Sequence, residues 1–262
     1  MKKLRWVLLV LLLMVFCQIG GSFAATEEAS APSPIDPDAM AILMKMADFI
    51  SKAKSFSVTI ESGYDSVQDN GEKIEYGGTR KLIIDRPNRA RENVEQRDGT
   101  QADFIFNGKE IFFYNAKDNV FGRIERPGTI DDAMEYFTEE LDMRLPLSEL
   151  FLVDLPTILR EQVLILDYVD KQKIEGADCD HLAARTENVD FQVWIEQGAK
   201  PLLRRVIITY KNALGQPQYR AEFSDWNFSP KITDSLFTIS PPKGAEEIPF
   251  AALMENKSDS EQ

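Results

Sequence analysis

The chain has 262 residues, 44% of them hydrophobic, and a formal net charge of −13 at pH 7. This acidity argues against binding to nucleic acid and against electrostatic docking on anionic lipid. The length suits one large β-rich domain or two small ones.

Residues 1–24 have the pattern of a cleavable signal peptide. Three basic residues precede an apolar run at 6–19, which is short for a membrane span. Small residues before the expected cut after Ala24 fit signal peptidase, so we expect a periplasmic protein with no stable membrane insertion. Because the segment holds three positive charges and no negative one, the mature net charge is −16. The alternatives are an uncleaved anchor and a lipoprotein anchored at Cys17, which the bulky Phe16 disfavours.

The mature chain is expected to hold one domain at 36–250, between a flexible leader at 25–35 and a disordered tail at 251–262. The leader consists mostly of Ala, Ser, Glu and Pro, and the tail is polar. Removing Cys17 leaves Cys179 as the only cysteine, so no intrachain disulfide can form. The fold must therefore be held by its core, and we favour a monomer.

The domain begins with a predicted helix. Asp36 is a good N-cap, and a proline is tolerated at the following position. Ile42, Met46 and Ile50 recur at helical spacing up to about residue 54. This apolar stripe must lie on another element.

An antiparallel meander follows. Alternating residues and turn signals such as Asn107-Gly108 predict six strands. Gly77-Gly78 predicts a bend or bulge in the second. These strands lie at 56–61, 73–85, 89–97, 102–106, 111–115 and 120–125.

The later strands of this meander carry aromatic residues on both faces. Ile111 and Phe113 share one face of their strand, whereas Phe112 and Tyr114 share the other. A sheet open to water on one side would not do this. We therefore expect apolar cover on part of each face.

Residues 129–162 are the expected cover. Thr129 can cap a helix, and Met134, Phe137 and Leu141 recur at helical spacing. Pro146 and Pro156 interrupt the apolar segment that follows. Broken helices between two antiparallel meanders indicate an α+β fold.

The second meander is predicted at 163–227, with its central three strands at 176–210. Together the elements predict a strongly curved antiparallel sheet, an incomplete barrel whose concave face is covered by helices. The last ordered piece is expected at 237–250, where Pro241-Pro242 ends a strand.

Cys179 and His181 lie two residues apart and so point to one face of a predicted strand. Such a pair could bind metal or act as a nucleophile pair. A metal would need two more ligands, and no motif offers an oxyanion hole. We therefore favour structural roles for both residues, with no metal, no cofactor and no catalytic residue.

The C-terminal half resembles a known family. The runs 179–183, 189–196, 201–202 and 204–205 are similar to a bacterial family of predicted periplasmic proteins of unknown function, and Arg86-Pro87-Asn88-Arg89 resembles one of its strands. That family looks related to the lipoprotein carriers LolA and LolB. The resemblance implies an incomplete barrel closed by helices, whose hollow receives acyl chains.

The resulting hypothesis is a non-enzymatic protein that binds a lipid, an acyl chain, a lipidated protein or another hydrophobic ligand in this hollow. The alternative is an envelope sensor of the same fold that binds a protein partner and no ligand. The third hypothesis is an enzyme that uses Cys179 and His181. Arg86, Arg89 and Arg91 are candidates for the mouth or for a ligand headgroup. The candidate cavity residues are Met46, Phe104, Phe106, Phe113, Met134, Phe137, Leu141, Phe151, Leu155, Phe191, Val193 and Phe223.

Overall fold

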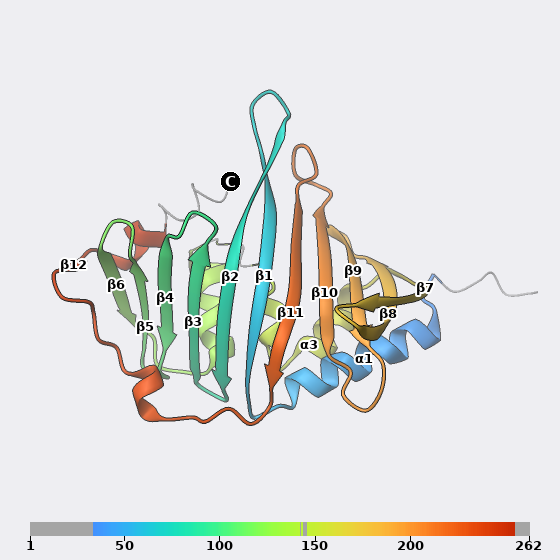
Figure 1. Cartoon of the computed structure of the whole chain (residues 1–262), viewed down its shortest axis with the longest axis horizontal. Helices are drawn as coiled ribbons and strands as arrows, with labels where there is room; N and C mark the ends of the chain where they lie inside the picture. The colour runs from blue at the N-terminus through green and yellow to red at the C-terminus, as the bar shows by residue number, and fades with distance from the viewer. Residues whose placement is uncertain (1–33, 142, 144–145, 255–262) are drawn as a thin grey trace, which may run out of the picture. The chain divides into compact units, whose positions relative to one another are not determined.

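The computed structural model describes residues 34–141, 143 and 146–254. The expected signal peptide at 1–24, residues 25–33 of the expected leader and residues 255–262 of the expected tail lie outside the described residues. The described part forms one sheet of 12 strands in the order β12-β6-β5-β4-β3-β2-β1-β11-β10-β9-β8-β7. Every neighbouring pair is antiparallel except β12 and β6 (Figure 1).

The strand bounds follow the two predicted meanders. The first contains β1 (Ser55–Val67), β2 (Lys73–Asp85), β3 (Arg89–Gln96), β4 (Gln101–Phe106), β5 (Glu110–Asn115) and β6 (Val120–Glu125). The second contains β7 (Ile165–Ile174), β8 (Ala177–Arg185), β9 (Val189–Glu196), β10 (Leu203–Tyr210) and β11 (Gln218–Asn227), and the short β12 (Glu246–Glu247) follows.

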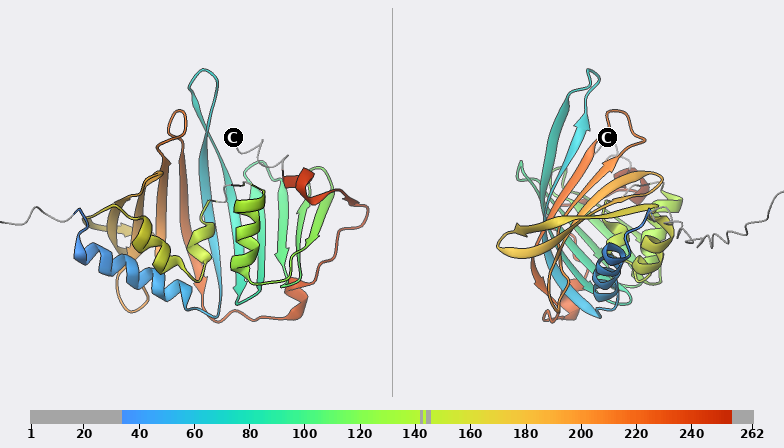
Figure 2. Two further views of the ribbon diagram at one scale, coloured as in Figure 1. Left: turned by 180° about the vertical axis from the view of Figure 1, so that it is seen from behind. Right: turned by 90° about the vertical axis from the view of Figure 1, so that its right-hand side faces the viewer.

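The sheet is strongly curved, and its helices, apart from the 3-10 turn at Asp234–Phe237, lie on its concave side (Figure 2). Its edge strands, β12 and β7, are not neighbours in the described sheet, so the barrel is incomplete. The predicted α+β fold is confirmed. The helices are α1 (Pro37–Ser51), α2 (Ile130–Glu135), the π-helical turn η1 (Tyr136–Glu140), the 3-10 turns η2 (Ser148–Phe151) and η3 (Asp234–Phe237), and α3 (Leu155–Gln162).

Local sequence explains how these helices begin. The Asp36 carboxylate accepts hydrogen bonds from the backbone N–H groups of Asp38 and Ala39 at the start of α1. Thr129 and Asp132 form a reciprocal capping box at the start of α2. None of the helices in the described residues is long and apolar enough to cross a membrane.

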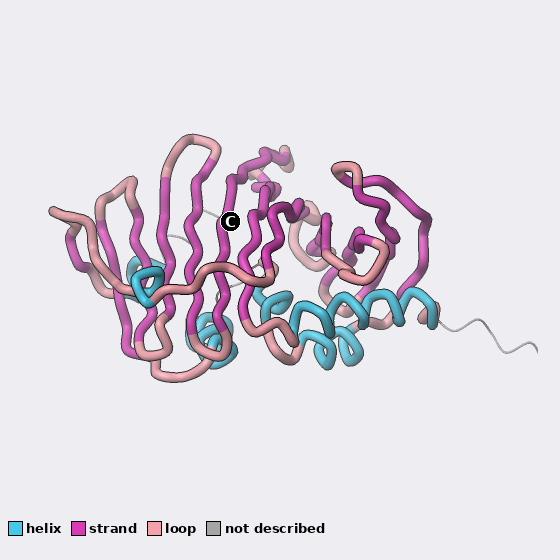
Figure 3. The backbone as a smooth tube through the Cα atoms, turned by 60° about the horizontal axis from the view of Figure 1, so that its bottom comes forward, coloured by secondary structure: helices cyan, strands magenta, loops and turns pink. Residues whose placement is uncertain are grey.

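Two apolar clusters cover the two faces. The large one lies on the concave side. The small one, around Ile105, Phe112, Phe121 and Phe237, lies on the opposite face. Residues of the expected cover at 129–162 pack on the concave face, but this opposite face is covered by the C-terminal segment at 232–245 (Figure 3). This explains why the β4 and β5 strands are apolar on both faces.

The folded domain extends beyond the expected bounds of 36–250 at both ends. The backbone of Leu166 is hydrogen-bonded to Pro34 and Asp36, and Ile35 packs on the core, although we expected a leader that packs on nothing. At the other end the chain continues as a helical turn to Met254, past the expected end at 250. Leu253 and Met254 are buried because they follow Phe250 at helical spacing.

The sequence predicts a bend or a bulge at Gly77-Gly78. The structure has no bulge there, because β1 and β2 pair without a register shift. A Cβ atom at Gly77 would lie 2.1 Å from the Ser62 carbonyl oxygen, and one at Gly78 would lie 2.3 Å from the Glu95 carbonyl oxygen. Glycine is therefore required here by the close approach of neighbouring backbones.

Candidate ligand-binding site

A cavity of about 750 Å³ opens on the concave side, near the turn that joins β1 to β2. Strands β1–β5, the β10–β11 connection with its flanking strand ends, and Met143 and Pro146 supply its walls. Its lining includes Ser62, Tyr64, Asp65, Val67, Gln68, Asp69, Arg80, Glu92, Val94, Gln96, Ala102, Phe113, Met143, Pro146, Tyr210, Leu214, Pro217, Gln218 and Tyr219.

The cavity begins where the concave-facing residues of several strands change from apolar to polar. On β2, Ile84 and Leu82 are buried in the core, and Arg80 follows on the same face. On β3, Ala90 is followed by Glu92. The change occurs on neighbouring strands, so the polar side chains form a layer between the packed core and the cavity.

Arg80, Glu92 and Tyr219 form this polar layer. Arg80 Nε donates to Glu92 Oε1 at 2.6 Å, and Arg80 Nη1 donates to the Tyr219 hydroxyl at 3.1 Å. The side chains of Arg80 and Glu92 are only 23% and 16% exposed. Burial opposes the charge of Arg80, but the negative charge of Glu92 outweighs it and raises the pKa of Arg80 above its ordinary value. Arg80 is therefore charged at neutral pH.

The walls beyond this layer are largely apolar. Val94, Ala102 and Phe113 come from three neighbouring strands, β3, β4 and β5. Met143 and Pro146 line the cavity from the side of the helices. These groups can make dispersion and hydrophobic contacts with an apolar ligand.

The rim includes Asp65, whose charged partners lie outside the cavity lining, and the exposed apolar side chain of Leu214. Arg220 Nη1 donates to Asp65 Oδ1 at 2.8 Å, and Lys73 Nζ lies 4.0 Å from Asp65 Oδ2. Leu214, in the β10–β11 connection, is 90% exposed. The connection passes close to β1: a Cβ atom added at Gly215 would lie only 2.9 Å from the Val67 side chain.

All twelve predicted cavity residues belong to the large concave cluster, as buried members or as half-buried neighbours. Of these, Phe113 lines the cavity. Seven of the others are buried in the core: Met46, Phe106, Phe137, Phe151, Leu155, Val193 and Phe223. The other four are half-buried and pack against it: Phe104, Met134, Leu141 and Phe191. The sequence thus placed these residues on the concave face, where the cavity opens, but did not single out Arg80, Glu92 or Met143.

The three predicted mouth residues do not line this cavity. Arg86 Nη2 donates to the Phe151 carbonyl oxygen at 2.6 Å, which ties the β2–β3 turn to η2. Arg89 is paired with Asp85 and with Asp234, and Arg91 is paired with Asp103 at 2.8 Å. Arg89, through Asp234, and Arg91, whose Nη1 also donates to the Leu236 carbonyl oxygen at 3.2 Å, hold the C-terminal segment against the outer face of the sheet.

Cys179 and His181 share one face of β8, as predicted, and that face is the outer one. Burial raises the pKa of the Cys179 thiol, which is 0% exposed and donates to the Ala177 carbonyl oxygen at 3.6 Å. His181 stacks on Trp194 with ring centroids 4.2 Å apart and is within hydrogen-bonding distance of Gln192. Both side chains thus pack and hydrogen-bond within the outer face of the sheet. No metal-binding group of three or more His, Cys, Asp or Glu residues is present in the part of the chain that the structure describes.

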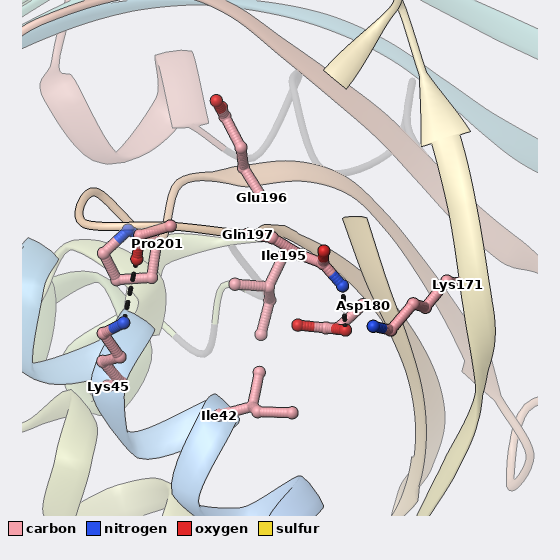
Figure 4. Close-up of a pocket in the computed structure, with 9 residues that line it drawn as sticks. Ile42, Lys45, Lys171, Asp180, Ile195, Glu196, Gln197 and Pro201 are labelled. Carbon is pink, nitrogen blue, oxygen red and sulfur yellow. Dashed lines mark hydrogen bonds between the residues drawn. The ribbon is translucent and has the colours of Figure 1, made fainter. Parts of the chain in front are cut away.

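A second, smaller cavity of about 230 Å³ lies beside α1 (Figure 4). Lys45 Nζ donates to the Gly198 carbonyl oxygen at 2.9 Å, and Gln197 Nε2 donates to Asp180 Oδ1 at 2.6 Å. The polar groups around this cavity therefore bond largely to one another. Its volume also lies below the range of roughly 300–1,000 Å³ that is usual for ligand sites. The larger cavity is the better candidate.

The fold and the concave cavity define an open half-barrel. Residues 39–251 match the family described as "Predicted periplasmic protein (DUF2092)". Because the match covers most of the sequence, the chain belongs to this family. The resemblance seen in the sequence and the expected periplasmic localisation are thereby confirmed. No curated protein matches the chain.

Solved structures with a similar fold include lipoprotein LppX from Mycobacterium tuberculosis, at 17% identity and a TM-score of 0.50, covering 76% of this chain and 100% of LppX. LprF from Mycobacterium bovis has 13% identity and a TM-score of 0.47, covering 80% and 99% of the two chains. A LolA superfamily protein from Nitrosomonas europaea has 12% identity and a TM-score of 0.35, covering 77% and 97%. At these identities the similarity concerns the fold alone.

Proposed function

We propose that this protein binds a ligand with an apolar chain in the 750 Å³ cavity and catalyses no reaction. The observation that carries the proposal is the cavity itself, whose volume lies within the usual range for ligand sites. Folded proteins have few voids larger than a water molecule, because each void sacrifices packing contacts. A hollow of this size therefore favours a role in binding.

The chemistry of the walls agrees with such a ligand. Burying one CH₂ group contributes about 0.8 kcal/mol, so a chain of several carbons laid along Val94, Ala102 and Phe113 would bind usefully. The polar layer at Arg80 and Glu92 would face one end of the ligand. Its two charges are paired with each other, which suits positioning better than acid–base chemistry.

Native mass spectrometry of gently purified protein, followed by solvent extraction, tests the proposal. We expect a bound species that extraction removes and that contains an apolar chain. The emptied protein should then bind the neutral fluorophore Nile red.

A pair of variants on β3 locates the binding. Val94→Trp should abolish Nile red binding because the indole would fill the cavity. Glu95→Trp is the matched control, since Glu95 is exposed on the opposite face of the same strand, and it should bind normally. A protein that is empty when purified and that does not bind Nile red would contradict the proposal and favour the protein-binding sensor.

A further inference from the structure

The charges around the cavity restrict the headgroup of its ligand. Arg80 is the only basic residue among the described residues that line the cavity, and three acidic residues accompany it: Asp65, Asp69 and Glu92. An anionic headgroup would need an uncompensated positive charge. The positive charge of Arg80 is already balanced by Glu92, 2.6 Å away.

The acidic residues are also compensated or lie at the rim. Asp65 is paired with Arg220 at 2.8 Å and lies 4.0 Å from Lys73. Asp69 is exposed in the turn between β1 and β2, where water screens its charge. A cationic headgroup inside the cavity would therefore find no unpaired buried carboxylate.

Uncharged hydrogen-bonding groups surround the same space. Gln68 and Gln96 carry amides. The Ser62 hydroxyl, which donates to the Gly78 carbonyl oxygen at 3.3 Å, and the Tyr219 hydroxyl, which accepts from Arg80 at 3.1 Å, each keep further hydrogen-bonding capacity. Hydroxyl and amide groups both donate and accept hydrogen bonds, so they can pair with ester, hydroxyl or amide groups of a ligand. Such pairing avoids the cost of desolvating an unpaired charge.

We propose that the ligand is an uncharged amphiphile, namely an apolar chain that bears a hydroxyl, ester or amide headgroup. This inference rests on the proposed function and specifies its ligand class. An anionic lipid would place its charge beside Glu92, in a protein whose net charge is already −13. The uncharged headgroup would lie against the Arg80–Glu92 pair, and the chain would lie along Val94, Ala102 and Phe113.

Three probes with the same acyl chain test this inference by displacing Nile red: monopalmitoylglycerol (uncharged), palmitate (anionic) and palmitoylcholine (cationic). We expect monopalmitoylglycerol to displace the dye at a concentration about tenfold lower than either charged probe. Equal or better displacement by a charged probe would overturn the inference and leave the proposed function standing. If Nile red does not bind and no probe is retained in native mass spectrometry, the proposed function itself fails.

A charge-removing variant sharpens the test. Glu92→Gln keeps a hydrogen-bond acceptor for Arg80 but leaves the arginine charge uncompensated, so the affinity for palmitate relative to that for monopalmitoylglycerol should rise about tenfold. Glu95→Gln makes the same change in net charge on the opposite face of β3 and should leave all three affinities unchanged. Equal effects of the two variants would overturn the inference. If Glu92→Gln does not fold, as judged by circular dichroism, the displacement series with the unmodified protein decides.

Discussion

The two ends of the concave face differ although the same strands build both. At one end, β1 contributes Phe56, Val58 and Ile60, which are buried in the concave core. At the other end the same face of β1 contributes Ser62 and Tyr64, which line the cavity. The sheet therefore obtains its stability at one end and leaves space at the other, and the Arg80–Glu92 pair marks the boundary.

The largest expected effect lies at the packed end. Phe56 is 0% exposed, and its ring centroid lies 5.7 Å from that of Trp226 and 6.0 Å from those of Phe151 and Phe228. Phe56→Ala should lower the free energy of unfolding by about 4 kcal/mol, because it removes buried area and leaves a void. Urea unfolding followed by circular dichroism measures this, and a loss below about 1.5 kcal/mol would mean that this end is also loosely packed.

The boundary layer should give the next largest effect. Arg80→Met should destabilise the protein by about 2 kcal/mol, because Glu92 and Tyr219 lose a charged donor. The double variant Arg80→Met/Glu92→Leu should recover much of this loss, since no unpaired charge remains. Arg97→Met, at a side chain that is 59% exposed, is the control and should cost less than about 0.5 kcal/mol. The pair would be unimportant if both arginine variants behaved alike in urea unfolding.

The rim should show a dependence on pH. Burial raises the pKa of Asp65, but the hydrogen bonds and charge of Arg220 outweigh it and hold the pKa below its ordinary value. The stabilisation is therefore present above the unfolded-state pKa of about 3.9 and is lost as the pH falls through the lower folded-state value. Asp65→Asn should cost about 1 kcal/mol at pH 7 and clearly less at pH 3, as measured by urea unfolding at both values. A deficit that does not depend on pH would show that the ionised carboxylate is unimportant.

The smallest effect is expected inside the cavity. Val94→Ala should change the free energy of unfolding by only about 0.5 kcal/mol, because Val94 is half-buried and faces open space. The same variant should weaken Nile red binding. A stability loss as large as that of Phe56→Ala would indicate that the cavity wall is packed core.

The sequence was sufficient for the fold and for the concave face on which the candidate cavity opens. Alternation along Phe56, Val58 and Ile60 fixed which side chains point inward, and turn signals such as Asn107-Gly108 separated the strands. The capping residues Asp36 and Thr129 located the helices that cover this face. These signals are local, so they can be seen without a structure.

The position of the cavity along the strands could not be predicted in the same way. Alternation shows which face of the sheet a residue occupies, but not how far the helices extend over that face. Phe106 and Phe113 therefore look equivalent in the sequence, although Phe106 is buried in the core and Phe113 lines the cavity. One available signal was missed: Arg80 continues the inward-facing series of Ile84 and Leu82, and a charge on an apolar face requires a partner. Its partner Glu92 lies on the neighbouring strand, so it can be identified only from the pairing register of β2 and β3, which local sequence does not give.

Photoaffinity labelling tests the central claim most directly. A monopalmitoylglycerol with a diazirine at the end of its acyl chain is bound to the protein and irradiated, and the labelled peptides are identified by mass spectrometry. We predict labels in the peptides that hold Val94, Ala102, Phe113 and Met143, and loss of these labels in Val94→Trp but not in Glu95→Trp. Labels around Phe56, or on the outer face near Cys179, would contradict the account.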